Sequence, residues 1–147
     1  MAVTIDIAYA GELHCRATHG PSGQSFTTDA PTDNGGKGEA FSPTDLVATA
    51  LGACLVTVMG IFASREGLDL DGTRVQVVKE MVSDPVRRIG ALTVRVVFPA
   101  GRNFSARDRA CLERTAHTCP VRQSLHPDVR VEMRFEYPDG DGSRLTT

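Results

Sequence analysis

A long apolar helix near the middle of the chain constrains the fold more than any other feature. Ser42 is a favoured N-cap and Pro43 suits the first helical position, so the start of the helix is well specified. Residues 46–63 are apolar on nearly every side, and Gly67 can adopt the left-handed conformation that ends a helix near residue 66. Because a helix that is apolar all round must be covered, we expect it to be buried at the centre of the fold.

The same segment is long enough to cross a membrane, but its composition favours a soluble core. It contains threonines, glycines and a cysteine, and soluble sequence flanks it on both sides. Residues 1–7 lack the basic and apolar segments of a signal peptide, and Asp6 interrupts them early. We therefore expect a cytoplasmic protein without a membrane partner.

Alternating patterns on both sides of this helix predict short strands. They lie near residues 3–9, 12–18, 24–29, 73–82, 92–96 and 129–137. Ser105 begins a second helix that runs to about His117. This order predicts an α+β fold in which antiparallel sheets carry the two helices on a face. The 147 residues fit one domain, assigned to 1–147, with residues 139–147 as a loose tail.

A cysteine directly before a proline breaks the second helix. The residue before a proline is pushed out of the helical region, and Pro120 can open a further short helix to about Leu125. Cys119 then lies at or next to the N-cap, where exposed amides lower the pKa of a thiol. Taken alone, Cys119 is either a capping residue or a reactive thiol.

Cys54, inside the long apolar helix, also has two interpretations. Free cysteine is among the most buried residue types, so Cys54 can be a packing residue. It can also be reactive, provided that another part of the fold brings a cation to its thiolate. Four cysteines without a Cys-x-x-Cys pair favour free thiols over a disulfide framework. Cys15 and Cys111 are expected to fill space.

Composition and spacing argue against several classes of partner. The net charge is −2 and no basic stretch is interleaved with aromatics, so we expect no nucleic acid. His117, Cys119 and His126 invite a zinc interpretation, but their spacings match no common zinc site. We therefore expect no metal and no cofactor, and a small molecule or a protein as the partner.

Three stretches together resemble a known family. Residues 41–46, Phe-Ser-Pro-Thr-Asp-Leu, open the helix that carries Gly-Ala-Cys at 52–54, and Val-Lys-Glu-Met follows at 78–81. The third stretch is His-Thr-Cys-Pro-Val at 117–121. Over about residues 5–137 the chain resembles the OsmC/Ohr family, the osmotically inducible and organic hydroperoxide resistance proteins, and within it the OsmC-like branch. Either cysteine context alone would be weak, and the pairing of the two is specific.

The resemblance implies an intertwined homodimer with the long helices at its centre and two active sites at the interface. It also implies a thiol-dependent peroxidase in which Cys54 attacks an organic hydroperoxide and becomes a sulfenic acid. Cys119 would then form a disulfide with Cys54, and a dithiol reductant would restore both thiols. The apolar surroundings of Cys54 favour an organic substrate, because its tail can be buried at about 25 cal/mol per Å².

The resemblance also implies an arginine from the N-terminal hairpin that activates the peroxidatic cysteine, and a glutamate that holds this arginine. Arg16 is the candidate for the arginine, although it can equally be a strand residue with its head in solvent. The hydroperoxide resistance proteins have Pro-Glu-Gln-Leu where this chain has Pro-Thr-Asp-Leu at 43–46. Asp45, Glu39 or Glu80 would have to substitute. Asp45 also suits the first turn of a helix without any catalytic role.

A non-catalytic protein of the same fold is the alternative. The missing Pro-Glu signature and the strongly apolar helix around Cys54 support a dimer whose interface pocket binds an apolar small ligand. In that interpretation Cys54 is a packing residue. The two hypotheses differ in one outcome, because only a peroxidase would lose turnover on the substitution Cys54→Ser.

Overall fold

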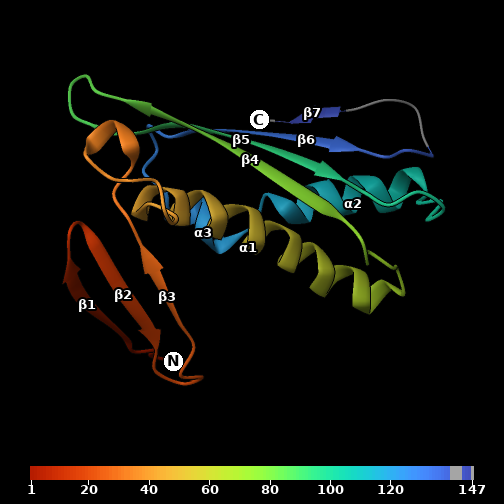
Figure 1. Cartoon of the computed structure of the whole chain (residues 1–147). Coiled ribbons are helices and arrows are strands. Elements are labelled where there is room, and N and C mark those ends of the chain that lie inside the picture. The colour runs from red at the N-terminus through yellow and green to blue at the C-terminus, as the bar shows by residue number, and fades with distance from the viewer. Residues whose placement is uncertain (140–143, 147) are drawn as a thin grey trace. The chain divides into compact units, whose positions relative to one another are not determined.

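The chain divides into two compact units, and the long helix α1 (Pro43–Glu66) spans the boundary between them in the sequence (Figure 1). The computed structural model describes residues 1–139 and 144–146. The first unit is Met1–Val47 and the second is Ala48–Thr147, so α1 begins in one unit and continues in the other. The assignment of residues 1–147 to one domain stays a prediction.

Three antiparallel strands form the N-terminal unit. They are β1 (Ile5–Gly11), β2 (His14–His19) and β3 (Ser25–Thr28), in the sheet order β1-β2-β3. The three strands expected before the long helix are thus confirmed. A short 3-10 helix, η1 (Thr32–Asn34), follows in the glycine- and proline-rich connection. The turn between β1 and β2 is tight, because Glu12 and Leu13 both have positive φ angles, 50° and 64°.

The ends of α1 lie where the capping signals placed them. The Asp45 backbone N–H donates to Ser42 Oγ over 3.1 Å, and the Ser42 backbone N–H donates to Asp45 Oδ2 over 2.9 Å. This reciprocal pair satisfies two amides that the first helical turn leaves without partners. At the other end Gly67 has a φ of 70°, a conformation that glycine adopts without steric cost.

The expectation that α1 is buried on every side is wrong for the single chain. Its buried residues form one stripe, namely Ala48, Leu51, Gly52, Leu55, Met59 and Ala63. Ile61, on the other side, keeps 50% of its surface exposed. Among the described residues, α1 is the one helix that is long and apolar enough to cross a membrane. Its 18-residue apolar window has a mean hydropathy of 2.3, and 33% of this window is buried. A core helix of a soluble protein has the same length and composition.

A four-stranded sheet forms the C-terminal unit with α1 and α2 on the same side (Figure 1). Its strands are β4 (Arg74–Val82), β5 (Arg88–Val97), β6 (Arg130–Glu136) and β7 (Arg144–Thr146), in that order. The α+β class is confirmed, but the sheet is not wholly antiparallel, because β5 and β6 run parallel. The connection between them carries two helices and crosses back along the sheet, as parallel neighbours require.

The last strand corrects the expectation of a loose tail over residues 139–147. Residues 144–146 form β7, which pairs antiparallel with β6. Without β7, β6 would be an edge strand with unpaired N–H and C=O groups, and even a short segment can satisfy such groups. Residues 140–143 and 147 of the predicted tail lie outside the described residues.

The second helix is broken as predicted. Its two parts are α2 (Ala106–Ala116) and α3 (Pro120–Ser124). Ser105 caps α2, as predicted, and it does so in a reciprocal box with Asp108. Cys119 is the N-cap residue of α3 and is fully buried. The break therefore points the Cys119 side chain inward rather than into solvent.

The core of the C-terminal unit is continuous from α1 to the sheet and α2. It includes Leu51 and Leu55 of α1, Leu92 and Phe135 of the sheet, and Leu112 of α2. Gly52 allows α1 to approach β4 closely, since a Cβ atom there would lie 2.9 Å from Val77 Cγ2. This close approach holds the middle of α1, where Cys54 lies, firmly against the sheet.

Candidate active site

The two cysteines singled out by the sequence contact each other in the C-terminal unit. Cys54 lies midway along α1 and Cys119 lies at the break between α2 and α3. Both are free thiols, Cys54 half-buried and Cys119 fully buried. The Cys54 and Cys119 side chains lie close enough to interact, and this interaction helps to raise the pKa of Cys119. A sulfenic acid formed on one of them would therefore have the other thiol as its neighbour.

The pKa of Cys119 is raised, contrary to the expectation from its capping position. Burial of the thiol is the largest cause, and the hydrogen bond with Cys54 also raises it. The backbone N–H groups of Arg122 and Val121 act in the opposite direction, but they close no capping hydrogen bond to the side chain. Burial therefore outweighs the local effect of the helix start, and Cys119 is held as a thiol at neutral pH.

Charged and polar side chains flank Cys119 along the sequence. His117, two residues before Cys119, has a lowered pKa because of its burial and because of the nearby Arg122 charge, while Glu113 partly opposes the shift. The Gln123 side-chain amide donates to the His117 carbonyl oxygen over 3.0 Å. Arg122 Nε is buried without a hydrogen-bond partner. The segment after α2 is thus held by polar contacts beside an apolar core.

Glu113 is a buried carboxylic acid that the sequence analysis did not single out. It lies on the buried side of α2 between Leu112 and Ala116, and it is only 8% exposed. The Tyr137 hydroxyl donates a hydrogen bond to Glu113 Oε1 over 3.2 Å. A charged residue on the apolar stripe of a helix was the available signal, because such groups are rarely buried without a partner.

The remaining predicted site residues lie on separate elements. Arg16 is exposed on β2 in the N-terminal unit, and its activation of Cys54 stays a prediction. Asp45 takes part in the cap of α1 with Ser42. Glu80 is exposed on β4 and forms a long ion pair of 3.9 Å with Arg130. Glu39 hydrogen-bonds to His14 within the N-terminal unit.

The other two cysteines have other neighbours. Cys15 is half-buried on β2, opposite Thr28 of β3. Cys111 is half-buried on α2, where its sulfur accepts a hydrogen bond from Arg114 Nη2 over 3.2 Å. Neither side chain belongs to the Cys54–Cys119 contact, so both provide matched controls for experiments on the reactive pair.

This arrangement defines a class of α+β proteins in which a long central helix presents a cysteine to a second cysteine at a helix break. The model of the OsmC-like protein family matches residues 36–134, which include both cysteines. The chain belongs to the OsmC-like family. No curated protein matches the sequence.

Solved structures share this fold along nearly the whole chain. One is a protein from Psychrobacter arcticus that is described as a candidate osmotic stress induced and detoxification response protein. It is 39% identical to this chain, the TM-score is 0.83, and the similarity covers 93% of this chain and 96% of that one. An organic hydroperoxide resistance protein OsmC from Legionella pneumophila is 15% identical, with a TM-score of 0.73 and coverage of 92% and 97%. OhrB of Bacillus subtilis, also an organic hydroperoxide resistance protein, is 18% identical, with a TM-score of 0.64 and coverage of 93% and 98%. The last two similarities concern the fold alone.

Proposed function

We propose that this protein is a thiol-dependent peroxidase that reduces organic hydroperoxides. The contact between the Cys54 and Cys119 thiols is the observation that carries this proposal. Two free cysteines that touch inside a largely apolar core have the arrangement needed to form a disulfide after one of them is oxidised. Membership of the OsmC-like family and the names of two structural relatives, both organic hydroperoxide resistance proteins, support the same assignment.

The proposed reaction has three steps. The Cys54 thiolate attacks the terminal oxygen of the hydroperoxide, the O–O bond breaks, and the alkoxide leaves and is protonated to an alcohol. Cys119, after losing its proton, attacks the sulfur of the Cys54 sulfenic acid, which expels water and forms the Cys54–Cys119 disulfide. A dithiol reductant then reduces this disulfide and is itself oxidised to a disulfide. Cys54 is the proposed peroxidatic residue because it is the less buried of the two thiols.

Cys54 would also need a cation, and we propose Arg16 for this role. A guanidinium group near the sulfur would favour the thiolate over the thiol. Arg16 is exposed on β2, so its guanidinium group is open to solvent and can meet a second chain in the proposed dimer. Asp45 and Glu80 remain supporting candidates, although each has a structural partner of its own.

The proposal includes a homodimer, because apolar surface remains uncovered on both units. Ile5, Ile7 and Tyr9 alternate along β1 with exposures of 58%, 68% and 68%, and Phe26 of β3 is 51% exposed. Ile61 of α1 is exposed as well. Contiguous apolar surface of this kind marks an interaction site in a soluble protein. A second copy of the chain would cover it, and we infer a cytoplasmic location for this dimer.

Mass spectrometry before and after one equivalent of cumene hydroperoxide tests the mechanism and the oligomeric state together. Under denaturing conditions we expect each chain to lose two hydrogens, and peptide mapping to place the new disulfide between Cys54 and Cys119. Under native conditions we expect the mass of two chains. An unchanged chain mass would contradict the peroxidase and would favour the alternative, a non-catalytic dimer whose pocket binds an apolar ligand.

The raised pKa of Cys119 predicts how the second step depends on pH. Cys119 attacks as a thiolate, and its pKa lies above the usual thiol value because of burial and the Cys54 contact. Below that pKa the thiolate fraction grows about tenfold for each pH unit, so the rate of disulfide closure should rise by about that factor. Stopped-flow measurement of closure after a single oxidation, from neutral to mildly alkaline pH, checks this. A closure rate that does not change with pH would contradict it.

A further inference from the structure

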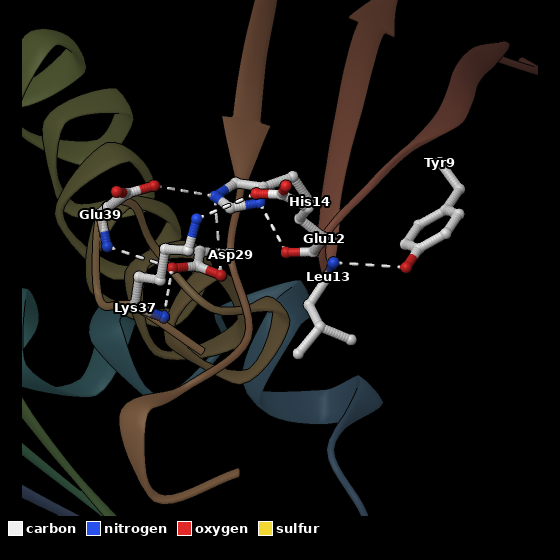
Figure 2. Close-up of polar contacts among 7 residues, drawn as sticks. All are labelled: Tyr9, Glu12, Leu13, His14, Asp29, Lys37 and Glu39. Atoms are coloured by element: carbon white, nitrogen blue, oxygen red, sulfur yellow. Dashed lines mark hydrogen bonds and ion pairs between the residues drawn. The ribbon is translucent and has the colours of Figure 1, made fainter. Parts of the chain in front are cut away.

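A cluster of three metal-ligating side chains, His14, Asp29 and Glu39, lies in the N-terminal unit (Figure 2). His14 is the first residue of β2, and Asp29 directly follows β3. Cys15 pairs with Thr28 in the antiparallel register. His14, the residue before Cys15, therefore comes opposite Asp29, the residue after Thr28. Glu39 comes from the connection before α1, and its backbone N–H donates to Asp29 Oδ2 over 3.1 Å.

The distances between the three ligand atoms fit a single small cation. His14 Nε2 lies 3.2 Å from Glu39 Oε2 and 3.7 Å from Asp29 Oδ1, and all three atoms lie within 4.8 Å of one another. A tetrahedral Zn²⁺ with ligands at about 2.0–2.2 Å holds its ligand atoms roughly 3.3–3.6 Å apart. Small side-chain adjustments would therefore place all three ligands on one ion.

The histidine is oriented as a metal ligand would be. His14 Nδ1 lies 2.8 Å from the Glu12 carbonyl oxygen, which can only accept a hydrogen bond, so Nδ1 carries a proton. The other ring nitrogen, Nε2, faces two carboxylates (Figure 2). Metal-bound histidines commonly donate their second N–H to a backbone carbonyl, which fixes the tautomer and the ring orientation. Nε2 is thus available for a cation between it and the carboxylates.

Asp29 supplies independent support, because one of its oxygens is buried without a hydrogen-bond partner. The residue is 1% exposed, and Oδ1 faces His14 at a distance beyond hydrogen-bond range. Oδ2 is satisfied by the backbone N–H groups of Lys37 and Glu39 at 2.9 and 3.1 Å. A buried carboxylate oxygen without a donor favours a cation as its partner.

The nearest lysine does not fill this position. Lys37 Nζ donates to Glu12 Oε2 over 2.9 Å, so its charge is directed to a carboxylate outside the cluster (Figure 2). Glu39 keeps 60% of its side-chain surface exposed and leaves one side of the cluster open to solvent. An ion can therefore enter from this side, and water can complete its coordination.

We propose that His14, Asp29 and Glu39 form a binding site for a divalent first-row transition metal ion, such as Zn²⁺. One imidazole and two carboxylates form a donor set that suits these ions better than Ca²⁺ or Mg²⁺, which favour oxygen ligands alone. The ion would join β2, the end of β3 and the connection before α1. The site requires neither Cys54 nor Cys119, so it does not depend on the proposed peroxidase.

Calorimetric titration of the whole protein with Zn²⁺, under a non-chelating reductant, tests the site. We expect Glu39→Gln to weaken Zn²⁺ binding at least about tenfold and His14→Ala about a hundredfold or more. Glu39 is exposed, so its substitution preserves the fold, which circular dichroism checks. His126→Ala is the matched control, because His126 Nδ1 lies 3.7 Å from Asp128 Oδ2 in an exposed pair outside the cluster. This control should bind Zn²⁺ as the wild type does.

A second measurement separates the cluster from the thiols, which also bind Zn²⁺. The variant Cys54→Ser/Cys119→Ser should retain the His14-dependent binding of Zn²⁺, and its thermal stability should rise on addition of Zn²⁺. The same variant with the added substitution Glu39→Gln should show no such rise in thermal stability. The proposal is overturned if Zn²⁺ does not bind, if Glu39→Gln and His126→Ala bind as the wild type does, or if the cysteine substitutions abolish binding.

Discussion

Substitution of Cys54 by serine is expected to lower the rate of hydroperoxide reduction by at least about 10³-fold, because it removes the proposed nucleophile. A hydroxyl group is nearly the same size as a thiol but is not ionised at neutral pH and does not form a sulfenic acid. Consumption of cumene hydroperoxide in the presence of a dithiol measures the rate. Full activity of Cys54→Ser protein would refute the mechanism.

Two further variants show which step is lost. Cys119→Ser should consume one equivalent of hydroperoxide and then stall, with Cys54 as a sulfenic acid or in a more oxidised state. Cys111→Ser should retain wild-type activity, because Cys111 lies on α2 with Arg114 as its hydrogen-bond partner and outside the thiol pair. Loss of activity in Cys111→Ser would indicate that serine substitutions act through the fold rather than through the chemistry.

Replacement of Phe98 by alanine is expected to destabilise the protein by about 3–5 kcal/mol, a large share of the roughly 5–15 kcal/mol typical of a domain. Phe98 is 1% exposed, directly after β5. Its ring stacks on Tyr137 with 4.5 Å between centroids and meets Phe104 edge-on at 5.5 Å. The alanine variant removes both ring contacts and leaves a cavity.

Urea denaturation at one fixed protein concentration measures this loss of unfolding free energy. The concentration must be constant because dimerisation would add to the apparent stability. Phe98→Leu is the matched control, since it retains apolar volume and removes only the ring geometry, and we expect it to cost less than half as much. If both variants lost the same free energy, ring stacking rather than cavity formation would dominate at this position.

The elements that local interactions specify could be predicted from the sequence. The caps of α1 and α2 depend on residues three positions apart, Ser42 with Asp45 and Ser105 with Asp108, and both are confirmed. The break at Cys119 follows from the ring of the next residue, Pro120. The pKa of Cys119 was predicted wrongly, because the same local motif lies inside a core whose burial has the larger effect.

The candidate site was predictable only in part. The family resemblance indicated Cys54 and Cys119 as a pair, and their contact is consistent with that pairing. Glu113 was missed because its partner, the Tyr137 hydroxyl, lies 24 positions away in the sequence, directly after β6. The cluster of His14, Asp29 and Glu39 was missed because no sequence spacing marks it.

The sequence by itself determined the elements other than β7, the α+β class and the two cysteine contexts, because capping, alternation and proline act within a few residues. The tertiary structure alone decided the parallel pairing of β5 with β6, the one-sided burial of α1 and the meeting of His14 with Glu39 across 25 positions. These depend on chain segments that pack together only after folding. Burial and the contacts that it creates are properties of the whole core, and no local pattern specifies them.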